Sequence, residues 1–224
     1  MHLPDGLLVH GTAVTAAATA VSVAACGAAL ARARHTLGER QVPLLGVTAA
    51  FVFAAQMLNF PVAAGASGHF LGAALAAILL GPLTALLVMA VVLVIQCLLL
   101  GDGGVTALGC NILNMGLVGG GLGYAAFRAL LAALGGGRRA LLAATAAASW
   151  LSLVLAAAAC AVELALTGTV PLRVGLPAMT GIHALIGIGE AVITTAAVSL
   201  ILSVRPDLLP GRAAVVEPAG RVSP

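Results

Sequence analysis

The first two residues of the chain, Met1 and His2, carry three nitrogen donors within a few covalent bonds of one another. The α-amine, the amide nitrogen of residue 2 and the imidazole Nδ1 could hold one metal ion in fused chelate rings. A fourth nitrogen would complete a planar set, which suits Ni(II), Cu(II) and low-spin Co(II). His69, in the segment "AGASGH", is the candidate for it. Two simpler interpretations stay open: an incidental terminal histidine at His2, and a helix cap or interhelical hydrogen bond at His69.

Such a site needs an N-terminus that is not removed. The bulky side chain of His2 should protect Met1 from methionine aminopeptidase, and the first apolar run lacks the positively charged region that begins a signal peptide. The stretch "VAAC" at 23–26 resembles a lipoprotein cleavage box and is the alternative. The turn-forming sequence Pro4-Asp5-Gly6 would direct the terminal residues back over the rest of the chain.

The elements that must position these residues are membrane-spanning helices. Of the 224 residues, 62% are hydrophobic and 8% are charged, so lipid is the expected solvent for most of the chain. The third apolar run is too short to cross a bilayer alone, and Gly81-Pro82 separates it from the fourth, so hydropathy allows six spans or seven. The runs fall at about 7–31, 42–60, 68–80, 82–100, 105–133, 139–167 and 178–204.

The arginines favour seven spans. With the N-terminus outside, the arginines between and beyond seven spans lie on the inner side, except Arg173. We therefore predict an all-α integral membrane protein with seven transmembrane helices, of which the third is short and tucked against its neighbours. The N-terminus would lie outside and insert toward the core, and the C-terminus would be cytoplasmic.

Two ionisable residues, His183 and Glu190, lie inside the last apolar run. Because they are seven residues apart, they share one helix face and could line an interior polar seam. Ionisable groups within spans need either a partner or a function. We expect them to give interior polar support, through contacts with helices that carry Gln96, Asn111 or Asn114.

The segment "GDGGVTALGCNILNMG" at 101–116 begins as a glycine-rich outer turn and continues into a helix. That helix brings Asn111, Asn114 and Met115 into the core, and the two asparagines share a face. On the predicted topology Asp102 and Glu163 lie near the outer surface, where they need only be solvated.

Several classes of protein are excluded. No GxxxxGK[ST] phosphate loop occurs, so the chain is not an ATPase, and we expect a subunit that is not an enzyme. There is no lysine, and the ten arginines are not grouped into a basic face, so no nucleic-acid partner is expected. The four cysteines show no CxxC spacing and are expected to be buried as small hydrophobes: Cys26, Cys97, Cys110 and Cys160.

Four segments in order resemble the membrane substrate-binding component of cobalt and nickel energy-coupling-factor (ECF) transporters, the CbiM/NikM family. They are "MHLPDG", "NFPVAAGASGHFLGAALAAILLGP", "GDGGVTALGCNILNMG" and "GIHALIGIGEAVIT", and the resemblance runs from residue 1 to about residue 204. It implies a single membrane substrate-binding domain over 1–204, followed by a polar cytoplasmic tail over 205–224.

The resemblance also implies a ligand set and partners. Met1 would supply its α-amine, His2 its amide and imidazole nitrogens, and His69 the fourth nitrogen. Residues in segments that look like the family's surrounding shell are Asn59, Ser67, Asn111, Asn114 and Met115, while His183 and Glu190 stay as interior polar support. The partners implied are two cytoplasmic ATPase subunits, a membrane coupling (T) subunit and, since no fused module follows before Pro224, a separate small accessory membrane subunit.

The expected function is capture of Co(II) or Ni(II) at the outer face of the cytoplasmic (inner) membrane and ATP-driven delivery inward. Co(II) for cobalamin biosynthesis is favoured, although both metals suit the same ligands. One alternative is a stand-alone permease that uses His183 and Glu190 for proton coupling. Another is a membrane scaffold that binds no metal.

Overall fold

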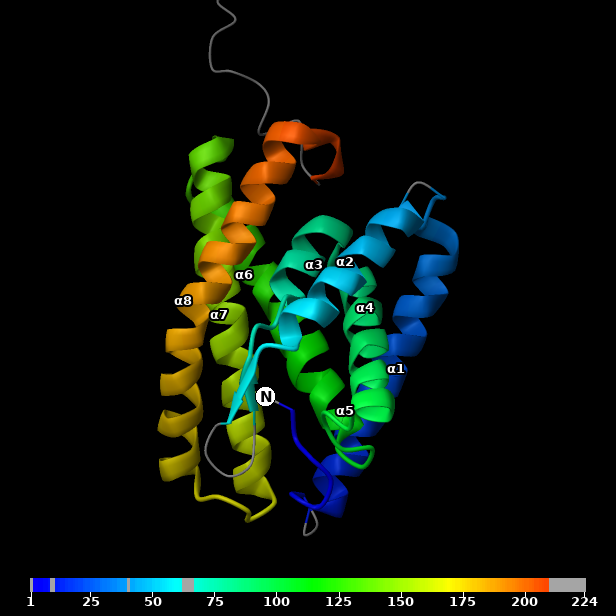
Figure 1. Ribbon diagram of the computed structural model, residues 1–224, viewed down its shortest axis with the longest axis vertical. Coiled ribbons are helices and arrows are strands. Elements are labelled where there is room, and N and C mark those ends of the chain that lie inside the picture. Colours follow the sequence, from blue (N-terminus) through cyan, green and yellow to red (C-terminus); the bar gives the residue numbers. More distant parts are fainter. Residues whose placement is uncertain (1, 9–10, 40, 62–66, 210–224) are drawn as a thin grey trace, which may run out of the picture.

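The computed structural model describes residues 2–8, 11–39, 41–61 and 67–209 as a bundle of helices with one short hairpin (Figure 1). The helices are connected by short loops, and most of them run nearly parallel to the long axis of the molecule. The elements are α1 (Thr12–Thr36), α2 (Gln41–Gln56), β1 (Asn59–Pro61), β2 (Ser67–His69), α3 (Ala73–Leu80), α4 (Pro82–Ile95), the π-helix η2 (Gln96–Leu100), α5 (Leu108–Ile112), the π-helix η3 (Leu113–Leu122), α6 (Gly123–Ala133), α7 (Gly137–Leu166), α8 (Leu172–Val204) and the 3-10 helix η4 (Pro206–Leu208).

Each of the seven apolar runs contains a helix, with ends that differ by a few residues from the predicted ones. Among the described residues, five helical stretches are long and apolar enough to cross a membrane, and α2 is a shorter apolar helix. The five are 12–36, 82–100, 108–133, 137–166 and 172–204. The chain is thus a mostly helical protein with several candidate spans. The count of seven spans and the orientation of the termini remain predictions.

The all-α prediction misses one feature, the hairpin between α2 and α3. Strands β1 and β2 pair antiparallel, with Asn59 opposite His69. Pro61 lacks a backbone N–H and disfavours helix in the residue before it, so the chain leaves α2 in an extended conformation. Pairing the two strands gives their backbone groups hydrogen-bond partners. The apolar run predicted over 42–60 therefore ends in strand β1, and the run predicted over 68–80 begins in strand β2.

Helix α3 is short and buried, as predicted. Its residues from Ala73 to Leu79 are at most 9% exposed. Glycines with positive φ stand on either side of it, Gly72 (φ 73°) before and Gly81 (φ 82°) after, and Pro82 then begins α4. These glycines allow the sharp turns that place α3 inside the bundle.

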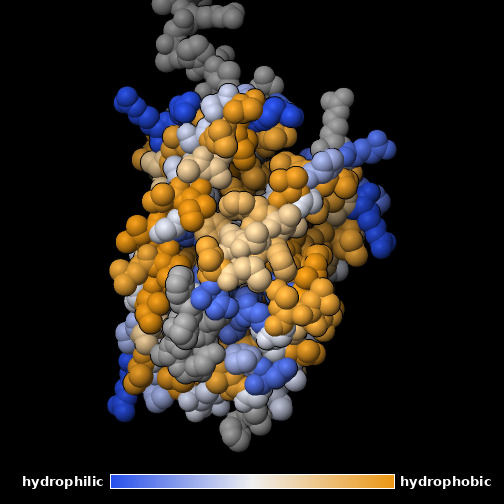
Figure 2. Space-filling view, viewed as in Figure 1, coloured by the Kyte–Doolittle hydropathy of each residue, from blue (hydrophilic) through white to orange (hydrophobic). Residues whose placement is uncertain are grey.

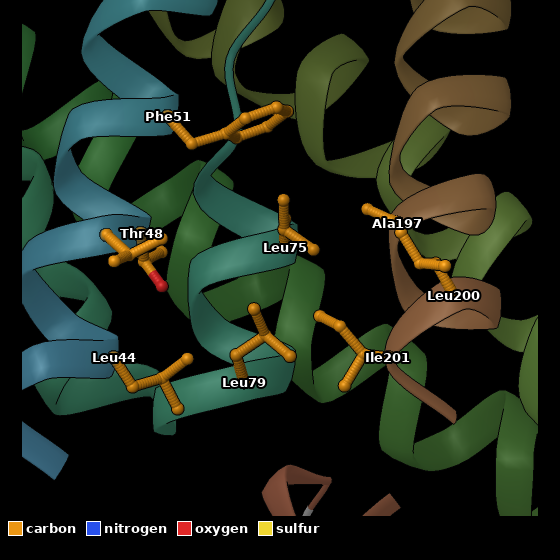
Figure 3. Close-up of a pocket in the computed structure, with 9 residues that line it drawn as sticks. Leu44, Thr48, Phe51, Leu75, Leu79, Ala197, Leu200 and Ile201 are labelled. Atoms are coloured by element: carbon orange, nitrogen blue, oxygen red, sulfur yellow. The ribbon is translucent and has the colours of Figure 1, made fainter. Parts of the chain in front are cut away.

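An apolar cavity of about 310 Å³ lies between α2, α3 and α8 (Figure 3). Leu75 and Leu79 of α3 form its floor, while Phe51 of α2 and Leu200 of α8 are among the residues on its two sides. In this region α2 and α8 are separated, and α3 packs against both.

The surface fits a membrane protein with a polar interior site. In Figure 2 hydrophobic residues cover most of the visible face, and hydrophilic ones gather at its two ends and near the hairpin. The predicted tail lies mostly outside the described residues, which end at 209. The first residues of the tail, from 205 to 209, are described, and Leu209 among them is buried. It is 7% exposed and packs in the hydrophobic cluster that contains Leu75 and Leu79.

Candidate metal-binding site

The two histidines singled out by the sequence, His2 and His69, lie face to face in the interior. Their rings are stacked with centroids 4.5 Å apart and planes 20° apart. His2 is 3% exposed and His69 is fully buried. The described chain begins inside the bundle, beside the hairpin that carries His69 (Figure 1). The structure therefore brings together two imidazoles that are far apart in the sequence.

The N-terminal segment is held by the turn and helix that follow the fourth apolar run. The Leu3 N–H donates to Asn111 Oδ1 at 2.9 Å, and Asn111 Nδ2 donates back to the Leu3 carbonyl at 3.3 Å. The Gly104 N–H donates to the same carbonyl at 2.8 Å. Leu3 is fully buried, so each of these bonds satisfies a group that water cannot reach. Asn111 thus fixes the residue next to His2.

Two further contacts hold the segment at its outer part. The backbone N–H and hydroxyl of Thr106 both donate to Asp5 Oδ1, at 2.9 and 2.6 Å. These bonds lower the pKa of the exposed Asp5 carboxyl below its ordinary value. Beyond them, the Thr169 hydroxyl donates to the Leu7 carbonyl at 2.9 Å. The predicted turn at Pro4-Asp5-Gly6 is present, with Gly6 at φ 82°.

Within the described residues, each imidazole keeps one ring nitrogen without a hydrogen bond. His69 Nδ1 lies 2.7 Å from the Phe70 carbonyl, which can only accept, so Nδ1 carries the proton and the buried Nε2 is left with its lone pair. His2 Nδ1 lies 3.0 Å from Asp102 Oδ1, and His2 Nε2 is buried and forms no hydrogen bond within the described residues, although the Gln96 side chain lies near the ring. Burial lowers the pKa of His2, which favours the neutral imidazole that metals bind.

In this arrangement the Nδ1 atom of His2, which the sequence suggests as a ligand, contacts Asp102. Binding of a metal through that atom requires the contact to open. Met1, the predicted source of the α-amine, lies outside the described residues. Within the part of the chain that the structure describes, no three His, Cys, Asp or Glu side chains form a group that could hold a metal ion.

Asp102 is closer to the site than sequence reasoning suggested. We expected it to be solvated at the outer surface, but its side chain is 20% exposed and contacts His2. Asn59, one of the predicted shell residues, donates to its other oxygen at 3.4 Å. Burial raises the pKa of Asp102, but the contacts with His2 and Asn59 outweigh this and lower it. Only the position of Asp102 directly after an apolar run could have signalled this role.

The other predicted shell residues lie in different places. Asn114 donates to Glu163 at 2.6 Å, and Glu163 is 6% exposed, so the expectation that Glu163 is solvated is wrong. The reason is that α7 packs along η3 and buries its carboxylate against Asn114. Met115 is fully buried in the main hydrophobic cluster. Ser67 belongs to β2, two residues before His69.

His183 and Glu190 are both buried on α8. His183 Nδ1 donates to the Met179 carbonyl of its own helix at 2.7 Å. Glu190 reaches the junction between β2 and α3, where it accepts from the backbone N–H groups of Leu71 at 2.7 Å and Gly72 at 2.9 Å. The expected side-chain partners Gln96, Asn111 and Asn114 are not the groups that bind these two residues in the described structure.

Two buried glutamines lie near the site, and sequence reasoning missed Gln56 and expected Gln96 to contact His183 or Glu190 instead. Gln56, at the end of α2, is fully buried and donates from Nε2 to the Leu71 carbonyl at 2.7 Å. Gln96 is also fully buried and lies close enough to interact with His2. A polar residue at the end of a long apolar run was the available signal for both.

Fold and site together define a multi-pass helical membrane protein with a buried pair of imidazoles. Comparison with known sequences is more specific. The chain belongs to the family described as the cobalt uptake substrate-specific transmembrane region, CbiM, whose sequence model matches residues 2–208. The resemblance found in the sequence is thereby confirmed.

Similar proteins cover almost the whole chain. A putative fused nickel transport protein NikMN of Archaeoglobus fulgidus is 42% identical over 216 residues, which cover 96% of this chain and 70% of that protein. A cobalt transport protein CbiM of Sorangium cellulosum is 34% identical over 214 residues, which cover 93% of this chain and 94% of the relative. A crystal structure of a truncated transition metal transporter is 32% identical, with a TM-score of 0.83 over 91% of this chain and 99% of that one.

Proposed function

We propose that this protein binds Co(II) or Ni(II) as a transport substrate, through the imidazoles of His2 and His69 together with the amide of His2 and the α-amine of Met1. The observation that carries the proposal is the stacked pair His2 and His69, buried inside a membrane bundle, where His69 Nε2 forms no hydrogen bond within the described residues. Relatives named for nickel transport and for cobalt transport support the substrate class.

We further propose that the metal enters from the outer face of the cytoplasmic membrane and is delivered inward by an ECF-type assembly. In that assembly two ATPase subunits, a membrane coupling subunit and a small accessory membrane subunit would act on this chain. The proposed orientation is supported by the distribution of arginines between and beyond the apolar runs. Delivery of Co(II) for cobalamin biosynthesis is the favoured role, with Ni(II) as the other candidate substrate.

The test is metal binding by protein with an untagged N-terminus. We expect the wild-type protein to copurify with, or bind stoichiometrically, Co(II) or Ni(II). His2→Ala and His69→Ala, and a version extended by one residue before Met1, should each lose this binding. His35→Ala is the matched control, because His35 is exposed at the end of α1. Normal binding by the extended protein would contradict the proposed ligand set.

Reconstitution separates the transport mechanisms. Metal uptake into liposomes should require the ATPase and coupling subunits and ATP. Uptake by this chain alone under a proton gradient would support the stand-alone permease instead.

A further inference from the structure

The backbone of Leu71, two residues after His69, is bound by side chains from two different helices. Glu190 of α8 accepts from the Leu71 N–H at 2.7 Å, and Gln56 of α2 donates to the Leu71 carbonyl at 2.7 Å. The second oxygen of Glu190 accepts from the Gly72 N–H at 2.9 Å. Both polar groups of one residue are thus held by side chains distant in sequence.

These bonds lie where water does not compete. Gln56 and Leu71 are fully buried, and Glu190 is 1% exposed. Hydrogen bonds to a carboxylate are stronger than those between neutral groups, and the low dielectric of the interior strengthens them further. Glu190 also lies at the N-terminus of α3, where a negative charge is favoured.

Steric contacts leave the junction little freedom. Gly72 has a φ of 73°, and a Cβ atom there would come within 2.8 Å of a methyl group of Val52 on α2. The backbone of this junction is therefore fixed by a hydrogen bond and a close contact from α2, and by two hydrogen bonds from α8.

The helices that supply these side chains are separated from one another. The cavity in Figure 3 lies between α2 and α8, with α3 as its floor. A second apolar cavity of about 310 Å³ lies between the end of α2 and the middle of α8, and both Phe70 and Glu190 line it. Among the described residues, Gln56 of α2 and Glu190 of α8 are connected through the backbone of Leu71, and Glu190 also binds Gly72.

We propose that Gln56 and Glu190 are positioning residues for His69, which set the place of its imidazole according to the relative position of α2 and α8. The proposal rests on the proposed function, because it assumes that His69 binds the metal. It makes the metal site sensitive to movement of α2 against α8: a shift of either helix pulls on the peptide two residues from the ligand.

The experiment measures Ni(II) binding by untagged protein, through affinity and through the visible absorption of the bound metal. Gln56→Met removes one hydrogen bond at nearly constant volume, and Glu190→Gln keeps the shape but removes one acceptor. Each should weaken binding about 10- to 100-fold, as is typical for residues that orient metal ligands. The absorption of the bound Ni(II) should shift toward that of His69→Ala.

The matched controls are Thr48→Val and Thr194→Val. Both threonines are buried, on α2 and α8 respectively, and neither hydroxyl bonds the junction within the described structure. These variants should bind Ni(II) with wild-type affinity and absorption. Thermal unfolding of all variants separates loss of stability from loss of positioning.

The outcomes are distinct. If the wild-type protein binds neither Ni(II) nor Co(II), the proposed function fails. If the wild-type protein binds Ni(II) and both Gln56→Met and Glu190→Gln bind it equally well with unchanged absorption, the positioning role is overturned and the metal site stands. The role is also overturned if these variants only unfold at lower temperature while the folded fraction binds normally.

Discussion

Docking of the N-terminal segment should depend on Asn111, and the size of the effect follows from its contacts. Asn111→Ala removes two hydrogen bonds to Leu3, of 2.9 and 3.3 Å. The Leu3 carbonyl keeps the Gly104 N–H, but the Leu3 N–H is left buried without a partner. Each hydrogen bond contributes about 0.5–1.5 kcal/mol net, and an unsatisfied buried donor costs a similar total. Either way, the free energy of docking the segment should fall by about 1–3 kcal/mol.

That free energy corresponds to a decrease of roughly 5- to 150-fold in the equilibrium constant for docking of the N-terminal segment. If His2 binds metal only when the segment is docked, the affinity for Ni(II) or Co(II) should fall by this factor. The Leu3 amide should exchange its hydrogen for deuterium faster by a similar factor, because exchange requires the segment to open.

Ser22→Ala is the control for this change. Ser22 is buried and donates to the Gly109 carbonyl of α5 at 2.7 Å, so its loss also removes a bond to that helix without touching Leu3. We expect Ser22→Ala to leave both metal affinity and Leu3 exchange near wild type. Unchanged Leu3 exchange in Asn111→Ala would refute the docking argument.

Three other perturbations test the same region. Gly104→Ala should displace the N-terminal segment, since its Cβ would collide with the Asp5 backbone, and we expect metal binding to fall more than 10-fold with unchanged helical circular dichroism. Asp5→Asn should weaken docking of the N-terminal segment slightly, and acid should do the same. Because bonds from Thr106 depress the pKa of Asp5, their stabilisation is present above the ordinary carboxyl pKa and is lost as the pH falls below it. Hydrogen exchange at Leu7 and neighbouring amides would show the loss. Gly72→Ala should destabilise the protein by about 1–2 kcal/mol from its positive φ alone, and the clash of its Cβ with a Val52 methyl group should add to that loss, which thermal unfolding would measure.

The helices were predictable from the sequence because lipid requires long apolar runs, and Gly81-Pro82 correctly separates α3 from α4. The hairpin was not, because Asn59 to His69 contains apolar and small residues that suit either a helix end or a strand. Its pairing depends on tertiary contacts, which place Asn59 opposite His69.

The meeting of His2 and His69 was predictable from residue type and an assumed common side of the membrane. Their partners were not. Asp102 follows an apolar run and suits solvent equally well, yet it lies 3.0 Å from His2 Nδ1. Gln56 occurs as a single polar residue whose role exists only once α3 folds back beneath it, so no spacing in the sequence could have revealed its bond to Leu71.

The contacts of the N-terminal segment also set an order of assembly. Residues early in the sequence have partners that appear much later: Leu3 bonds a residue 108 positions away, and Leu7 one 162 positions away. During synthesis the segment must therefore wait until most of the chain has been inserted, and closing such long loops is slow relative to local helix formation. Leu3 and Leu7 are therefore among the last residues to complete their native contacts. A nascent chain that stops before Thr169 lacks the contact that holds Leu7.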